Sequence, residues 1–188
     1  EIFAGAIQDY KRGIIIGQKT FGKGTVQKLD DLSSGQIKIT ESKFYRVTGS
    51  GMQSKGINPD ITLPSTWDIE EFGESSFETA LPWDEIEPIN YKKFSMQSSL
   101  ISQLNDKHSI RVDNNPNLQY ILDVRKRYEI QKNKKIISLN LTKRRVEKDE
   151  RQTWALDVEN KRRSSLNLEI FNSYKDMEDY NDSKETEE

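Results

Sequence analysis

Cysteine is absent from the sequence, which excludes disulfide bonds, thiolate zinc sites and a cysteine nucleophile. Histidine is almost as scarce. The one histidine, His108, lies in a charged segment that we expect to form a solvated helix surface. A single histidine supports neither a Ser-His-Asp triad nor a histidine-based metal site. We therefore expect no metal ion and no cofactor.

Long apolar runs are also missing. No segment approaches the roughly 18 apolar residues that a transmembrane helix needs, and no signal peptide is visible. Hydrophobic residues make up 33% of the chain and charged residues 32%, which is polar for 188 residues that must bury a core of their own. Because the chain begins with Glu1 and not with Met, we expect a fragment or processed product whose apolar surface packs partly against further sequence.

The charges cancel to a net charge of −2, but they alternate in blocks along the chain. Basic residues prevail in 1–66 and 113–163, and acidic residues prevail in 67–112 and 164–188. No domain-wide basic field results, and Lys and Arg in the second basic block are interspersed with Asp and Glu, as on solvated helices. Nucleic acid is therefore not an expected partner.

The first part of the sequence has the pattern of an α/β unit. Apolar residues spaced by three and four from Ile2 to Tyr10 predict an amphipathic helix that ends before Gly13. The β-branched run at 14–16 predicts a strand that is buried on both faces. A helix followed by a buried strand is typical of an α/β unit.

Extended segments are predicted next, at 25–29 and 36–47, with a bulge near 41–42 where the alternation of apolar residues changes phase. Residues 49–64 are rich in turn formers and predict a loop that closes this region. From about Trp67 the composition becomes acidic and then helical.

The rest of the sequence predicts mainly helices, and the fold class is therefore α+β. The boundary lies near residue 66, between a domain of helix, buried strand and antiparallel strands at 1–66 and a helical domain at 67–175. Four features are predicted within or after the helical domain: an N-cap among Asp113, Asn114 and Asn115, a short strand near 136–141, a long charged helix from about Thr142 to Tyr174, and a disordered acidic tail at 176–188.

Lys23 lies in a glycine-rich segment, GQKTFGKGT, directly after the predicted buried strand. The spacing of Gly17, Gly22 and Lys23 matches a phosphate-binding loop, which also needs Ser or Thr after the lysine and a helix behind it. Gly24 follows Lys23 and the sequence beyond is β-like, so an NTP site is disfavoured. Two interpretations remain: a solvated lysine at the tip of a turn, or a lysine partly desolvated by apolar neighbours. A desolvated, neutral amine can activate a serine hydroxyl without histidine.

The segment EIFAGAIQDYKRGIIIGQKTFGKGTVQ closely resembles the catalytic region of the tail-specific proteases, or C-terminal processing peptidases, of serine peptidase family S41. The landmarks are EIFA, RG, TFGKG and VQ, within residues 1–27. KFYRV and KGINPDI resemble the closing strands of that peptidase domain. ALPWD, NLQYI and ISLN resemble the helical C-terminal extension of the larger, tail-specific branch. The resemblance covers most of the chain and weakens after about residue 145.

The resemblance implies that Lys23 is the general base of a Ser/Lys dyad and that Gln27 orients it. A glutamine can hold an amine donor without the negative charge that would favour the ammonium form. The nucleophilic serine is expected in the few residues before Glu1, and neither Ser33 nor Ser34 matches its context. The helix that follows this serine would turn its positive end toward the developing oxyanion.

At the level of the whole protein, the resemblance implies a serine endopeptidase of the bacterial periplasm or cell envelope. Its substrates would be proteins with exposed C-terminal tails, with an adaptor protein as a further partner, and the present chain would be inactive alone. The alternative is a non-catalytic interaction platform formed by 67–188. Because strand edges and apolar faces of a partial core are exposed, homodimerisation of the chain is also expected.

Overall fold

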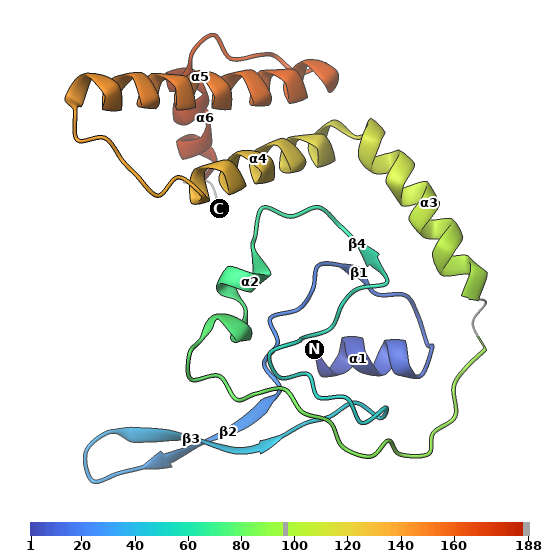
Figure 1. Ribbon diagram of the computed structural model, residues 1–188. Helices are drawn as coiled ribbons and strands as arrows, with labels where there is room; N and C mark the ends of the chain where they lie inside the picture. Colours follow the sequence, from blue (N-terminus) through green and yellow to red (C-terminus); the bar gives the residue numbers. More distant parts are fainter. Residues whose placement is uncertain (96–97, 186–188) are drawn as a thin grey trace. The chain divides into compact units, whose positions relative to one another are not determined.

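The computed structural model describes residues 1–95 and 98–185. It has the predicted α+β class and divides by compactness into two units, Glu1–Ser109 and Ile110–Glu188, which we describe one at a time (Figure 1). The predicted boundary at residue 66 does not coincide with this division, because segments between residues 74 and 108 hydrogen-bond to the first 62 residues. Among the described residues, no helix combines the length and the apolar character that crossing a membrane requires.

Helix α1, Ile2–Asp9, and a short pair of strands open the first unit. The prediction of α1 is confirmed. Strand β1, Ile16–Gly17, pairs in parallel with β4, Ile61–Thr62, through Ile16↔Ile61 and Gly17↔Thr62. The expectation of a strand buried on both faces is wrong for this chain, because Ile16 in β1 remains 55% exposed.

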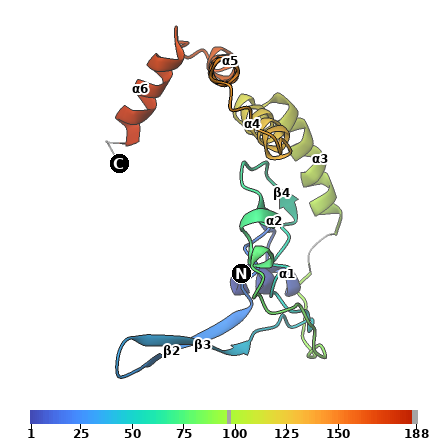
Figure 2. The same cartoon turned by 60° about the vertical axis from the view of Figure 1, so that its left-hand side comes forward.

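Strands β2, Thr25–Asp31, and β3, Gln36–Lys43, form an antiparallel hairpin that extends away from the rest of its unit (Figures 1 and 2). The pairing passes from Val26↔Ser42 to Gln27↔Thr40, so Glu41 is the extra residue of a bulge. The bulge and the extended segments are confirmed, except that β3 ends at Lys43 and that Tyr45 beyond it forms an isolated bridge with Gly51. The bulge lies where the hairpin leaves the glycine-rich segment that contains Lys23.

The core of the first unit is built by the segment that the sequence predicts as a loop. Met52, Ile57 and Ile61 are its buried apolar residues, and Gln53 is buried with them at 1% exposure. A loop can be this deeply buried because its backbone groups are hydrogen-bonded to other segments, for example Ser54 N–H to Gly22 O at 2.8 Å.

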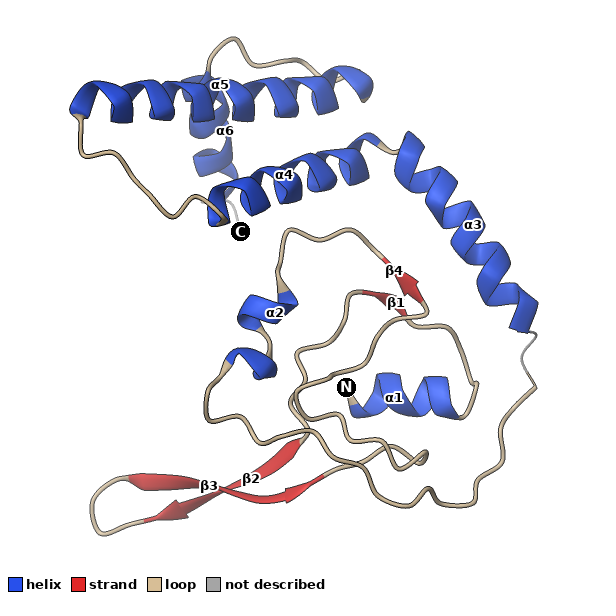
Figure 3. Cartoon of the chain, viewed as in Figure 1, coloured by secondary structure: helices blue, strands red, loops and turns tan. Residues whose placement is uncertain are grey.

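Three elements follow: helix α2, Ile69–Phe72, the 3-10 turn η1, Glu74–Ser76, and helix α3, Ser98–Asn114, whose residues up to Ser109 belong to the first unit. Residues 78–88 between η1 and α3 are irregular apart from the bridge Ser50↔Glu85 (Figure 3). The expectation that His108 is solvated is wrong. His108 is 6% exposed, and its Nε2 lies 3.0 Å from the carbonyl oxygen of Thr62, next to the end of β4.

The second unit consists of α4, Pro116–Lys132, α5, Leu141–Ser165, and α6, Tyr174–Glu185. The N-cap of α4 is Asn115, from the predicted Asp-Asn-Asn cluster, and its side chain accepts hydrogen bonds from two backbone N–H groups of the first turn. The predicted strand near 136–141 is wrong. These residues form a loop and the start of α5, have no partner strand among the described residues, and leave Leu139 99% exposed.

The predicted long charged helix is confirmed as α5 but ends before Tyr174, and a separate helix, α6, occupies most of the predicted tail. α5 ends at Ser165, shortly before Asn167 adopts a left-handed conformation with φ of 55°. The Asn160 side chain then exchanges two hydrogen bonds with the backbone of Phe171, at 2.8 and 2.9 Å. Residues 176–185, which the sequence predicts to be disordered, are instead helical, because Met177 is buried and Tyr180 packs on Phe171. Residues 186–188 of that prediction lie outside the described residues.

Candidate functional site

Lys23 lies in the loop between β1 and β2, and we call residues 20–24 the lysine loop. The chain continues from this loop into strand β2 and not into the helix that directly follows the lysine in a phosphate loop. Gly22 has φ of 99°, a left-handed region that glycine adopts without strain. The glycines of this loop therefore allow a backbone path that other residues could adopt only with strain.

Glu1 fixes the lysine loop from one side. Its carboxylate Oε1 accepts a hydrogen bond from the backbone N–H of Gly22 at 2.6 Å. Glu1 is also the N-cap position of α1, and its carbonyl oxygen accepts the first helical hydrogen bond, from Gly5 N–H at 2.9 Å. The N-terminal end of α1 is thereby held against the residue that precedes Lys23.

Gln53 fixes the lysine loop from the other side. Its Oε1 accepts a hydrogen bond from the backbone N–H of Gly24 at 2.8 Å, within the buried core. A Cβ atom on Gly24 would lie 2.4 Å from the backbone nitrogen of Gln53, so only glycine allows this approach. The carbonyl oxygen of Gly24 in turn accepts from Phe44 N–H at 3.0 Å, beyond the end of β3.

Gly24→Ala should therefore destabilise the chain by about 1–3 kcal/mol, the usual cost of overpacking a close contact. Since the added Cβ would meet backbone atoms of Gln53, rotation of a side chain cannot relieve the contact. Chemical denaturation followed by circular dichroism measures the change. Gly13→Ala is the comparison, because Gly13, like Gly24, has no positive φ, and an added Cβ there meets only the side chain of Ile7, at 3.3 Å. Equal unfolding midpoints for Gly24→Ala and the unsubstituted chain would contradict the packing argument.

The two residues expected to carry the chemistry are not joined by a direct hydrogen bond in the structure. Lys23 is half-buried and its Nζ donates to Thr25 Oγ1 at 3.2 Å. Gln27 is exposed on β2, and its Nε2 donates to Thr40 Oγ1 across the hairpin at 3.4 Å. Thr25, two residues from each of them, is the residue whose hydroxyl meets the amine.

Glu1 and Gln53 are the residues of the site that sequence reasoning missed. Glu1 was seen as part of a motif, but its side-chain contact with Gly22 depends on tertiary structure. Gln53 lies in a segment of turn formers, and nothing in the neighbouring residues marks it as buried. The pair of glycines around Lys23 is the signal that could have pointed to close packing of the loop.

The second unit has a cavity of about 390 Å³ among α4, α5 and α6. Tyr120 and Trp154 contribute aromatic surface, and Glu159 and Arg162 form an ion pair at 2.6 Å at its wall. Burial, and next the charge of Glu159, raise the pKa of Tyr120, so its hydroxyl is a neutral donor over the physiological range. Residues with these properties suit a protein or peptide contact better than proton-transfer chemistry.

Known protein families match both the region around Lys23 and the helical remainder of the chain. Residues 1–63 match peptidase family S41, and residues 67–188 match the C-terminal domain of tail specific protease (DUF3340). The chain therefore belongs to the S41 peptidases. Within them it belongs to the tail-specific proteases, because the second match covers most of its length.

Several curated relatives are similar to this chain. The tail-specific protease of Haemophilus influenzae is 39% identical over 161 residues, which cover 79% of this chain and 23% of that protein. The carboxy-terminal-processing protease of Bartonella bacilliformis is 44% identical over 64 residues, or 34% of this chain and 15% of the relative. The chloroplastic C-terminal processing peptidase of Tetradesmus obliquus is 41% identical over 64 residues, or 34% and 14%. The chain thus spans less than a quarter of the length of each.

Proposed function

We propose that this chain supplies the general base, Lys23, of a serine endopeptidase whose nucleophilic serine lies in the few residues before Glu1. The observation that carries the proposal is the 2.6 Å hydrogen bond from Gly22 N–H to Glu1 Oε1. Because this bond holds the N-terminal end of α1 against the lysine loop, a serine placed directly before the helix would lie near the residue that bears the amine. The half-buried setting of Lys23 and the family membership support the same assignment.

In the proposed reaction Nζ of Lys23 takes the proton of the serine hydroxyl while the serine Oγ forms a bond to the scissile carbonyl carbon. The N-terminal end of α1 carries partial positive charge from its unpaired N–H groups, which favours the negative oxygen of the tetrahedral intermediate. When the C–N bond breaks, the proton on Nζ passes to the leaving amine. Water then attacks the acyl-enzyme, and the lysine again takes the proton and returns it to the serine.

Gln27 is proposed as the residue that orients Lys23. Its amide oxygen can accept a hydrogen bond from the amine without adding negative charge. Since Gln27 contacts Thr40 in the structure, this role needs a change of rotamer that turns its amide from β3 toward Lys23. With Gln27 in its present rotamer, the amine of Lys23 donates instead to the hydroxyl of Thr25.

The substrates proposed for the complete protease are proteins recognised by exposed C-terminal tails, in the periplasm or envelope of a bacterium, with an adaptor protein as a further partner. The names of the relatives, tail-specific and carboxy-terminal-processing proteases, support proteolysis directed at C-terminal tails. By "complete protease" we mean a protein in which this chain follows the rest of an S41 core. The 188-residue chain alone is proposed to be inactive, and to self-associate through apolar residues such as Phe3, which is 76% exposed.

The test compares the complete protease with the isolated chain on an unfolded substrate that ends in an apolar tail. We expect turnover by the complete protease, a loss of turnover when one serine just before Glu1 is replaced by alanine, and no turnover by the isolated chain. Ser33→Ala is the matched control and should leave turnover unchanged. Turnover by the isolated chain, or dependence on Ser33, would overturn the assignment of the nucleophile.

A second candidate function, an interaction platform, is favoured by the cavity among α4, α5 and α6. Residues 110–188 are a compact unit, so they are the part to test and not the whole of 67–188. If the platform exists, immobilised 110–188 will bind the purified adaptor of the complete protease, and Trp154→Ala will weaken that binding. Equal binding by the Trp154→Ala variant would exclude this cavity as the contact.

A further inference from the structure

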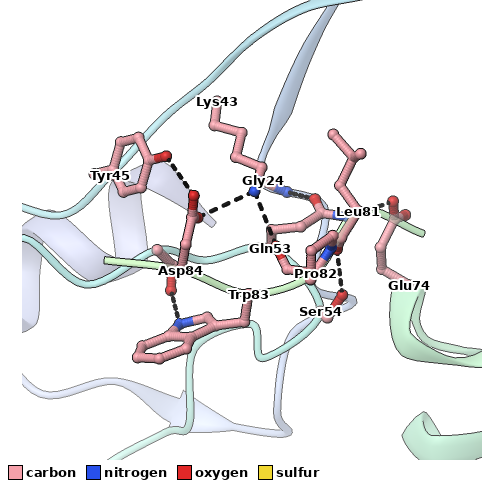
Figure 4. Close-up of polar contacts among 11 residues, drawn as sticks. Gly24, Lys43, Tyr45, Gln53, Ser54, Glu74, Leu81, Pro82, Trp83 and Asp84 are labelled. Carbon is pink, nitrogen blue, oxygen red and sulfur yellow. Dashed lines mark hydrogen bonds and ion pairs between the residues drawn. The ribbon is translucent and has the colours of Figure 1, made fainter. Parts of the chain in front are cut away.

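The lysine loop is enclosed by a ring of hydrogen bonds that runs through two side chains. Gln53 Oε1 accepts from Gly24 N–H at 2.8 Å, and Gln53 Nε2 donates to Glu74 Oε1 at 2.9 Å. Glu74 then returns to the loop through its backbone, since its N–H donates to Phe21 O at 2.8 Å. The ring spans residues 21–24 and therefore fixes the backbone on both sides of Lys23. Figure 4 shows the part of the ring in which Gln53 bonds to Gly24 and to Glu74.

The amide of Gln53 has one orientation that satisfies this ring. A backbone N–H can only donate and a carboxylate can only accept, so the oxygen must face Gly24 and the nitrogen must face Glu74. A glutamate at position 53 could not donate to Glu74 and would place two carboxylates together. An apolar residue would leave the buried N–H of Gly24 without its acceptor. Glutamine is thus the side chain whose chemistry fits this position.

The segment that carries Gln53 is itself held by residues 81–84, which we call the strap. Gly51 N–H donates to Asp84 O at 3.1 Å, and Trp83 Nε1 donates to Gly51 O at 2.9 Å. On the other side of Gln53, Ser54 Oγ donates to Leu81 O at 3.1 Å. Lys55 adds a cation–π contact, with its Nζ 3.1 Å from the centre of the Trp83 ring.

The strap is anchored in turn at the base of the hairpin. Lys43 Nζ donates to Asp84 Oδ1 at 3.1 Å and to Pro82 O at 2.9 Å, and Tyr45 OH donates to Asp84 Oδ2 at 3.1 Å (Figure 4). Desolvation, and next the hydrogen bond to Asp84, raise the pKa of Tyr45, so the phenol stays a donor. Glu74 and the strap both lie in the part of the chain that matches the C-terminal domain of tail specific protease.

We propose that Gln53 and Glu74 are positioning residues for the general base, and that the first part of the C-terminal domain completes the catalytic site by holding Gln53 through the strap. This inference rests on the proposed function of Lys23. Residues 74–84 thus act on the reaction through the backbone of the lysine loop, without touching the reacting atoms.

The test uses variants of the complete protease and measures kcat and KM separately. Gln53→Met removes both side-chain bonds at similar volume, and Glu74→Leu removes the bond between the side chains. Each should lower kcat by up to about 10²-fold with KM nearly unchanged, because misplacement of a catalytic group by about 1 Å costs that much. Glu74→Gln keeps an oxygen acceptor for Gln53 Nε2 and should retain most of the activity.

A second readout does not depend on turnover. Hydrogen exchange of the Gly24 amide should become about tenfold faster in Gln53→Met, as expected for the loss of one hydrogen bond. Ile61→Val is the control, since Ile61 is 2% exposed in β4 and outside the ring. If Gln53→Met fails to fold, the comparison of Glu74→Leu with Glu74→Gln still decides, because Glu74 is only half-buried.

The outcomes separate the two proposals. Activity that is lost in Lys23→Ala but equals that of the Ile61→Val control in Gln53→Met and Glu74→Leu would overturn the positioning role and leave the general base intact. Activity retained in Lys23→Ala would overturn the proposed function and this inference with it. Equal kcat for Glu74→Leu and Glu74→Gln would exclude the bond between the two side chains as the cause.

Discussion

Lys23→Ala in the complete protease should lower kcat by about 10²- to 10⁴-fold, the range expected when a positioned general base is lost. The fold should persist, because the side chain of Lys23 makes one hydrogen bond, to Thr25, and the lysine loop is held by contacts of its glycines. Initial rates on a tail-bearing unfolded protein measure the effect, and thermal unfolding of the same samples checks the fold.

Lys28→Ala is the matched control for this prediction. Lys28 lies five residues further on, in strand β2, where its Nζ pairs with Asp30 at 2.8 Å and its side chain is 61% exposed. We expect turnover of that variant to stay close to the unsubstituted level, since exposed ion pairs contribute about 0–1 kcal/mol. A Lys23→Ala variant that turns over substrate as fast as Lys28→Ala would refute the dyad and favour the other interpretation, a solvated lysine at the tip of a turn.

Elements whose signals are local were predictable from sequence. Spacing by three and four gave α1, alternation gave β2 and β3, and the change of phase near Glu41 gave the bulge. The N-cap of α4 was predictable for the same reason, since the Asn115 side chain bonds to backbone N–H groups of its own helix.

Features that depend on contacts between distant segments were not predictable. His108 is polar and lies among charges, yet it is buried because its ring meets the carbonyl oxygen of Thr62. The short strand β1 shows the reverse case, since a run of three isoleucines predicts burial that requires neighbours on both sides. Helix α6 forms in an acidic segment because Met177 and Tyr180 find apolar partners, which composition alone does not reveal.

The functional site likewise has one part that the sequence predicts and another part that depends on contacts between distant segments. Lys23 and Gln27 were found through motif resemblance, but the reason for the glycines around Lys23 appeared only with Glu1 and Gln53 in place. Glycine spacing that imitates a phosphate loop here permits close approach of two backbones. A glycine pattern therefore indicates a tight backbone path, and the residues on that path decide whether a phosphate or a buried glutamine lies against it.

Replacing Arg46 by methionine should destabilise the chain by about 3–5 kcal/mol, the usual cost of breaking a buried ion pair on one side. The carboxylate of Asp9 is 4% exposed at the C-terminal end of α1, and Arg46 Nε donates to its two oxygens at 2.9 and 3.1 Å. Methionine keeps much of the packing of the arginine stem but leaves the charge of Asp9 buried and unpaired. Chemical denaturation measures the loss.

The double variant Arg46→Met with Asp9→Leu separates this cause from simple loss of packing. Removing both charges should recover a large part of the stability, because the main penalty is the unpaired buried carboxylate and not the absence of the bond. Lys38→Met, on the exposed face of β3, is the comparison for charge removal without burial. Equal destabilisation in the single and double variants would contradict the argument. Because α1 carries Glu1 at its other end, this ion pair also holds the helix whose N-terminal end fixes the lysine loop, so its loss should reduce turnover by the complete protease as well.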